Sequence, residues 1–273
     1  MAQELIRIER DGSVLIIRLS NAKSRNSLTI EMREELGEAV DLAANDHTVR
    51  SVFLTGDGPT FCSGGDLKHL QTACDPWPVH RRFRSLSRWL TPLITLDKPV
   101  VVGVNGHAVG GGMGLALTGD VVIAGESAKF MSGFFRLGAI PDIAIMYHLP
   151  RLIGMARTKN FLFSGGSFSA HEAAELGLVS KVVSDVELYE TGLLEAKRLA
   201  EGPAEVMGLA KIIMARSFET SLHDMLAFEG FGQALAMSNP EFREGLSAAL
   251  TRRPADFVGA AASANAHSNG SQE

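Results

Sequence analysis

Residues 98–120 constrain the fold of this chain most, because an apolar segment, a glycine cluster and a helix start follow one another there. The first part, residues 100–104 (Val-Val-Val-Gly-Val), predicts a buried strand. Three consecutive glycines, 110–112, then lead into a helix of small residues expected at about 113–117. Backbone N–H groups at such a helix start have no intrahelical acceptor and suit a negatively charged oxygen. The alternative is that the glycines only let the helix pack closely on a sheet.

A second segment of the same kind lies earlier in the chain. A short strand is expected at 51–55, and residues 61–67 (Phe-Cys-Ser-Gly-Gly-Asp-Leu) then lead into a helix start. Asp66 could be no more than a cap for that helix. The sequence therefore offers two separate glycine turns at which backbone N–H groups can be exposed.

The remaining patterns predict an α/β fold with a helical C-terminal part. Strands are expected at 4–9 and 14–20, and an amphipathic helix at 30–45 with Thr29 as its N-cap. The proline-rich residues 74–78 should break any helix, and a helix at 79–90 should end at Pro92. Ser169 and Glu172 form a capping-box pattern. From Asp185 onward nearly all of the chain has helical periodicity.

Composition excludes several classes of partner. A net charge of −5 argues against nucleic-acid binding, and no uncharged apolar run reaches the length of a membrane span. Two cysteines, Cys62 and Cys74, argue against a disulfide scaffold and favour a reducing, cytoplasmic location. No Cys/His cluster has the spacing of a metal site, so we expect neither a metal nor a bound cofactor. The segment 259–273 is rich in Ala, Ser, Asn and Gly, and we expect a disordered tail there.

Together the two glycine segments resemble those of the crotonase superfamily, the enoyl-CoA hydratase/isomerase family. The matching segments are Phe61-Cys-Ser-Gly-Gly-Asp-Leu67 and Asn105-Gly-His-Ala-Val-Gly-Gly-Gly112, in the family's order and approximate spacing. The resemblance covers residues 5–258. It implies an α/β spiral of ββα units over residues 1–200 and a C-terminal helical trimerisation region over 201–258. It also implies homo-trimers, often paired into hexamers.

The resemblance further implies an acyl-CoA thioester substrate, whose coenzyme A enters as part of the substrate. The thioester oxygen would lie between the backbone N–H groups of Gly65 and Gly111, which agrees with the two glycine turns described above. By resemblance, the coenzyme A groove would include Arg25, Ser27, Ser63, Gly64, Asp66 and Leu67. For Arg25, contact with the coenzyme A phosphates and a solvated surface position remain equal alternatives.

At two positions the sequence departs from the hydratases that it resembles. Those enzymes have glutamates at the positions of Gly114 and Phe134, and the two glutamates handle the water that is added. Here Phe134 is expected to shape the acyl pocket or to be part of the core. Asp142 remains as the candidate acid/base, and the apolar neighbours should raise its pKa. The alternative role of Asp142 is an N-cap for a helix at 143–149.

The segment Leu137-Gly-Ala-Ile-Pro-Asp142 is most similar to ring-1,2-epoxyphenylacetyl-CoA and oxepin-CoA isomerases. We therefore expect an acyl-CoA isomerase in which Asp142 moves a proton through an enolate held by Gly65 and Gly111. One alternative is a dehalogenase or hydrolase with Asp142 as nucleophile. Another is a catalytically weak acyl-CoA-binding protein. The sequence identifies neither the acyl group nor the number of subunits, and it assigns no role to His107 or Cys62.

Overall fold

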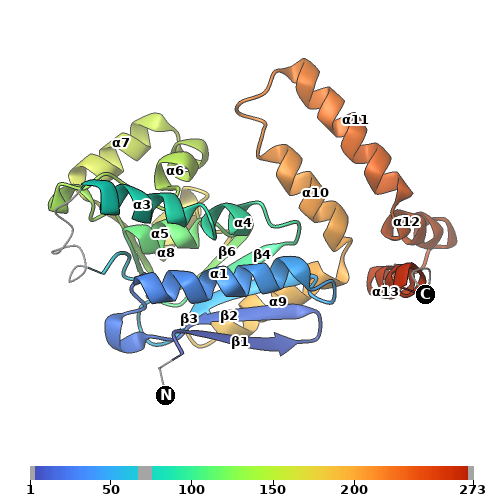
Figure 1. Cartoon of the computed structure of the whole chain (residues 1–273), viewed down its shortest axis with the longest axis horizontal. Coiled ribbons are helices and arrows are strands. Elements are labelled where there is room, and N and C mark those ends of the chain that lie inside the picture. The colour runs from blue at the N-terminus through green and yellow to red at the C-terminus, as the bar shows by residue number, and fades with distance from the viewer. Residues whose placement is uncertain (1–3, 67–75, 270–273) are drawn as a thin grey trace.

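A six-stranded sheet runs through the body of the protein, in the order β1-β2-β3-β4-β6-β9 (Figure 1). The computed structural model describes residues 4–66 and 76–269. The strands of this sheet are β1 (Ile6–Asp11), β2 (Val14–Leu19), β3 (Ser51–Gly56), β4 (Val100–Val104), β6 (Val121–Gly125) and β9 (Lys181–Val183). Strands β1 and β2 form an antiparallel hairpin, and every other neighbouring pair is parallel. The predicted strands at 4–9, 14–20, 51–55 and 100–104 are thereby confirmed.

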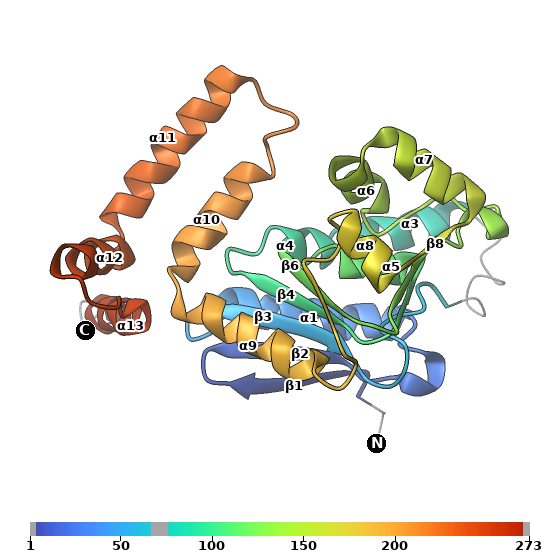
Figure 2. The ribbon, with the colours of Figure 1, turned by 180° about the vertical axis from the view of Figure 1, so that it is seen from behind.

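Strand residues alternate between the two faces of this sheet, as a sheet covered on both faces requires. Val52 and Leu54 belong to the core cluster that contains helix α1 (Ile30–Asn45). Phe53 points the opposite way and packs in a second cluster with helix α9 (Leu188–Glu201). Figures 1 and 2 show α1 and α9 on opposite sides of the sheet.

A smaller sheet of three short strands lies next to the first, in the order β5-β7-β8. Its strands are β5 (His107–Val109), β7 (Lys129–Met131) and β8 (Ser167–Ser169). The helices that surround the two sheets are α3 (Pro76–Leu86), α4 (Leu90–Ile94), α5 (Gly111–Ala116), α6 (Ile145–Ile153), α7 (Met155–Ser164) and α8 (Ala170–Glu175). Short 3₁₀ turns lie at η1 (Ala22–Ser24) and η2 (Phe135–Leu137).

Capping side chains begin two of these helices where the sequence predicts. The Thr29 hydroxyl accepts a hydrogen bond from Met32 N (3.2 Å), and α1 has the predicted bounds. The Ser169 hydroxyl and the Glu172 carboxylate form both halves of a capping box at the start of α8. Each side chain satisfies backbone groups that the first helical turn leaves without intrahelical partners.

The proline-rich region differs from the prediction. Helix α3 begins at Pro76, inside the segment expected to break any helix, because proline is well tolerated in the first turn of a helix. Pro92 likewise does not end a helix but lies within the first turn of α4. The single helix expected at 79–90 is therefore two helices, separated after Leu86.

The C-terminal helices extend away from the sheets (Figures 1 and 2). They are α10 (Ala204–Met214), α11 (Leu222–Ser238), α12 (Pro240–Thr251) and α13 (Phe257–Asn269). The prediction of a disordered tail at 259–273 differs from the structure, in which α13 extends to residue 269. Alanine is frequent in that segment and has the highest helix propensity, which here outweighs the low-complexity composition.

A buried ion pair connects the C-terminal helices to the sheet. Arg50, just before β3, is 6% exposed, and Glu241 in α12 is 1% exposed. Arg50 Nη2 lies 2.7 Å from Glu241 Oε1, and Arg50 Nε donates to the Ala200 carbonyl at the end of α9 (2.7 Å). None of the described helices is long and apolar enough to cross a membrane.

Candidate active site

The two glycine segments predicted from the sequence lie side by side. Cys62 N donates to His107 O (3.1 Å), and Val109 N donates back to Cys62 O (2.9 Å). Gly64 has a φ of +81°, and a Cβ atom added to it would lie 2.6 Å from Val109 O. The same Cβ would lie 3.1 Å from Gly111 N, so only glycine permits this approach.

Asn26 holds the first glycine segment in place from the neighbouring loop. Its buried side-chain amide donates to the carbonyls of Thr60 (2.9 Å) and Phe61 (3.1 Å). The Leu28 backbone N–H also donates to Gly64 O (2.8 Å). The loop 25–28 thus has a clear structural role through Asn26, a residue that the sequence analysis does not single out.

The backbone N–H groups of Gly65 and Gly111 are available to bind an anionic oxygen only if they donate no other hydrogen bond. Among the hydrogen bonds of the described residues, none is donated by the backbone N–H of either glycine. Gly111 is the first residue of α5, where the N–H groups lack intrahelical acceptors. Both glycines line the same cavity.

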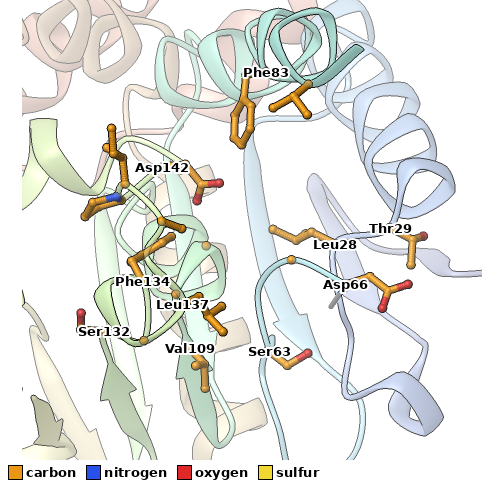
Figure 3. Close-up of a pocket in the computed structure, with 18 of the residues that line it drawn as sticks. Leu28, Thr29, Ser63, Asp66, Phe83, Val109, Ser132, Phe134, Leu137 and Asp142 are labelled. Carbon is orange, nitrogen blue, oxygen red and sulfur yellow. The ribbon is translucent and has the colours of Figure 1, made fainter. Parts of the chain in front are cut away.

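This cavity, of about 790 Å³, lies between the glycine segments, the start of α1, helix α3 and the segment that leads to α6 (Figure 3). It is lined by Leu28, Thr29, Ile30, Arg33, Ser63, Gly65, Asp66, Val79, Phe83, Val109, Gly110, Gly111, Ser132, Gly133, Phe134, Leu137, Gly138, Ala139, Ile140, Pro141 and Asp142. The lining is mainly apolar, with a few polar groups, as is usual for sites that bind small molecules.

Six of the predicted site residues line this cavity: Ser63, Gly65, Asp66, Gly111, Phe134 and Asp142. Gly64 lies directly behind the lining, against Val109. Leu67 lies outside the described residues.

Arg25 and Ser27 do not line the cavity. Arg25 is exposed, and its carbonyl accepts a hydrogen bond from Ser63 N (3.0 Å), so its backbone lies beside the glycine segment. Ser27 is buried in the same loop. Arg33 in α1 and Phe83 in α3 line the cavity instead. In the sequence, these two residues are ordinary helix positions, and no motif marks them as cavity residues.

Asp142 brings a half-buried carboxyl group next to Gly111. Its Oδ1 atom lies 3.3 Å from the position that a Cβ atom on Gly111 would occupy. Figure 3 shows the Asp142 carboxylate directed into the space between the Phe134 and Leu28 sides of the cavity. Helix α6 begins at Ile145 with Ala144 as its N-cap, so Asp142 is not at the capping position that the alternative interpretation assigns to it.

Gly114, the first of the two positions that the sequence resemblance matches to hydratase glutamates, has no room for a side chain. A Cβ atom there would lie 2.2 Å from the Ile143 carbonyl oxygen and 2.8 Å from Ile143 Cβ. Phe134, at the second position, is buried, and its ring lies 3.6 Å from where a Cβ on Gly110 would be. The Ile143 backbone therefore fills the space beside position 114, and an aromatic ring occupies position 134.

Two other titratable side chains of the region lie outside the cavity lining. Burial raises the pKa of the Cys62 thiol to about 12, so it remains a neutral core group. Burial, and secondarily the charge of Arg151, lower the pKa of His148 to about 4. His148 lines a different cavity, next to Arg151 and Lys211. Among the described residues, no group of His, Cys, Asp and Glu is arranged to hold a metal ion.

Comparison with known proteins agrees with this geometry. The family model for enoyl-CoA hydratase/isomerase matches residues 9–260. The 1,2-epoxyphenylacetyl-CoA isomerase of Escherichia coli (strain K12) is 37% identical over 261 residues, which cover 94% of this chain and 99% of that protein. The crotonyl-CoA hydratase of Syntrophomonas wolfei subsp. wolfei is 31% identical, with the same coverage of each chain.

Solved structures agree as well. The crystal structure of an enoyl-CoA hydratase/isomerase from Cupriavidus metallidurans CH34 has a TM-score of 0.88 and 30% identity, and covers 94% of this chain and 97% of the other. A family model that matches nearly the whole chain, together with that structural similarity, fits the paired glycine segments and the cavity between them. This chain belongs to the enoyl-CoA hydratase/isomerase family and has the crotonase fold.

Proposed function

We propose that this family member is an acyl-CoA isomerase, which moves a proton within an acyl-CoA thioester and does not add water. The observation that carries the proposal is the pairing of Asp142 with Gly111, next to a Gly114 position that is closed to any side chain. Adding water across a double bond requires one group to activate the water and another to protonate carbon. A 1,3-proton shift requires only one group, which takes the proton and then returns it.

In the proposed mechanism, the Asp142 carboxylate removes a proton from the carbon α or γ to the thioester carbonyl. The electron pair moves onto the carbonyl oxygen, and the Gly65 and Gly111 N–H groups donate hydrogen bonds to the resulting enolate. Asp142 then returns the proton to the other carbon, so that the substrate and product have the same atoms. Preorganised donors of this kind contribute about 3–4 kcal/mol each to transition-state stabilisation.

A second carboxylate, Asp66, also lines the cavity but is a poor candidate for the second catalytic group. Figure 3 shows the Asp66 carboxylate directed away from Asp142. Nucleophilic attack by Asp142, as in the dehalogenases, is also less well supported. Those enzymes have a histidine near the position of Ser87, and here the Ser87 hydroxyl donates to Arg84 O (2.7 Å).

The proposal includes a homo-trimer or a pair of trimers, with acyl-CoA as the only other partner and with no bound cofactor. Large exposed apolar side chains on the C-terminal helices support self-association. They include Leu222, Phe231, Leu235 and Leu250. Light scattering of the purified protein would test the subunit number, and a monomer would contradict this part of the proposal.

A panel of acyl-CoA substrates, followed by mass and ultraviolet spectra, tests the proposed reaction. Isomerisation changes the spectrum without changing the mass, whereas hydration adds the mass of one water. Hydrolysis releases free coenzyme A, which a thiol reagent detects. We expect isomerisation of at least one unsaturated or ring-containing acyl-CoA, with slow or absent hydration of crotonyl-CoA. Turnover of any acyl-CoA would exclude a protein that only binds such thioesters.

A further inference from the structure

Two consecutive residues with left-handed backbone conformation follow Asp142. Ile143 has a φ of +48° and Ala144 a φ of +57°. A β-branched residue rarely adopts this conformation, and such outliers persist only where the surrounding structure holds them. Of the residues with positive φ, Ile143 is the only β-branched one in the part of the chain that the structure describes.

The Ile143 side chain is packed against the amide-bearing glycine of the site. Ile143 is 3% exposed, and its Cγ1 lies 3.0 Å from the position of a Cβ atom on Gly111. Asp142 Oδ1 lies 3.3 Å from that same position. The carboxylate and the isoleucine, from adjacent positions in the chain, therefore both lie beside the same glycine and fill the space where its side chain would be.

Backbone contacts hold the turn on both sides. The Asp142 carbonyl accepts a hydrogen bond from Ile145 N (3.2 Å), at the first residue of α6. The Ile143 carbonyl occupies the space beside Gly114 in α5. The direction of the chain after Asp142 is thus determined by its contact with α5 and by the start of α6.

We propose that Ile143 is a positioning residue, which holds the Asp142 carboxylate at a fixed distance from the Gly111 amide. This inference rests on the proposed function, because it assumes that Asp142 moves the proton and that Gly111 binds the oxygen. A displacement of about 1 Å between reacting groups can reduce a rate by about 10²-fold. A side chain that determines this distance affects kcat without contacting the substrate.

The test compares Ile143→Gly, Ile143→Val and Ala144→Gly in the full-length protein, with trans-3-hexenoyl-CoA as the probe. Ile143→Gly removes the contact with Gly111 and also removes the backbone strain. We expect kcat per folded molecule to fall by up to about 10²-fold with KM little changed. Because the variant also loses a buried side chain, its melting temperature should fall, and rates are compared at a temperature at which both proteins are folded. Ile143→Val keeps the branched side chain and should recover most of kcat. Ala144→Gly relieves the same kind of strain one residue later and should leave kcat near the native value.

An unchanged kcat per folded molecule in Ile143→Gly would overturn the inference, as would a loss of activity fully accounted for by a smaller folded fraction. A crystal structure of Ile143→Gly gives a second readout that does not depend on turnover. We expect the Asp142 carboxylate to move away from Gly111, and an unmoved carboxylate would overturn the inference even if the native protein were inactive. Failure of the proposed function itself would be seen separately, as full activity in Asp142→Asn.

Discussion

The Asp142 carboxylate lies against Gly111, with Oδ1 3.3 Å from the point where a side chain on that glycine would begin. This relationship brings a titratable group and a backbone N–H donor to one wall of the cavity. The two groups come from parts of the chain about thirty residues apart, so their proximity depends on the tertiary fold.

Replacing Asp142 with asparagine should reduce isomerisation by at least about 10²-fold, because an amide cannot take a proton at neutral pH. Acyl-CoA affinity should change little, since the cavity walls and backbone donors remain. The measurement is kcat together with the incorporation of solvent deuterium at the α or γ carbon of the product. Asp41→Asn, on the exposed face of α1, is the matched control and should keep the native rate. Near-native turnover in Asp142→Asn would remove Asp142 from the mechanism.

Replacing Gly64 with alanine should separate the two glycine segments, because the new Cβ would lie 2.6 Å from Val109 O. Misplaced oxyanion donors typically cost about 10²–10³-fold in kcat. Gly12→Ala is the matched control, because Gly12 also has a positive φ (+59°) but has open space around its Cβ position. That control should lose about 1 kcal/mol of stability from backbone strain and keep its activity. Equal activities for the two variants would contradict the role of the paired segments.

Introducing glutamate at the two positions that the resemblance matches to hydratase glutamates, as Gly114→Glu with Phe134→Glu, should not produce a crotonyl-CoA hydratase. The Ile143 carbonyl fills the space at position 114, so even Gly114→Ala should cost about 1–3 kcal/mol in unfolding free energy. Gly37→Ala, within α1, is the control. The Cβ atom of that alanine would make an ordinary 3.5 Å contact with Trp89. Urea denaturation measures the stabilities, and the gain of one water in mass measures hydration. Efficient hydration by the double variant would refute the steric argument.

Breaking the buried pair between Arg50 and Glu241 should destabilise the protein strongly. Glu241→Ala leaves a buried guanidinium without its carboxylate, which typically costs about 3–5 kcal/mol. The exposed pair between Glu195 and Arg198 provides the comparison, and Glu195→Ala should cost under about 1 kcal/mol. Chemical denaturation of both variants measures the difference. Similar losses would show that the buried pair contributes no more than a surface one.

His148 should make the stability depend on pH. Its pKa is lowered to about 4 in the folded protein, so the unfolded chain binds the proton more tightly. The free energy of unfolding should therefore fall as the pH decreases from about 6.5 toward about 4, by up to about 1.4 kcal/mol per pH unit from this residue. His148→Leu should remove this part of the slope, which the difference between two denaturation series at several pH values would measure. An unchanged slope would contradict the lowered pKa.

Local sequence signals predict much of the frame of the molecule. Thr29 and the apolar periodicity after it are enough to define α1, because capping and amphipathicity act within a few residues. The paired glycine segments could be predicted as neighbours only through the family resemblance, since their hydrogen bonds join residues more than forty positions apart.

The residues that the sequence did not reveal depend on tertiary contacts. Arg33 and Phe83 line the cavity because α1 and α3 both border it. No local pattern distinguishes these residues from other helix positions. The left-handed turn at Ile143 and Ala144 runs against local preference, because such turns normally contain glycine. The backbone conformation of these two residues is therefore determined by packing against α5 and not by their intrinsic propensity.

The contact between Ile143 and Gly114 also limits how this sequence can change over evolutionary time. A carboxylate at position 114 would first require the chain after Asp142 to move away from α5. If Ile143 positions Asp142 as proposed above, that movement would also displace the proposed acid/base. Position 114 is therefore expected to accept a larger residue only together with a change in the segment that follows Asp142.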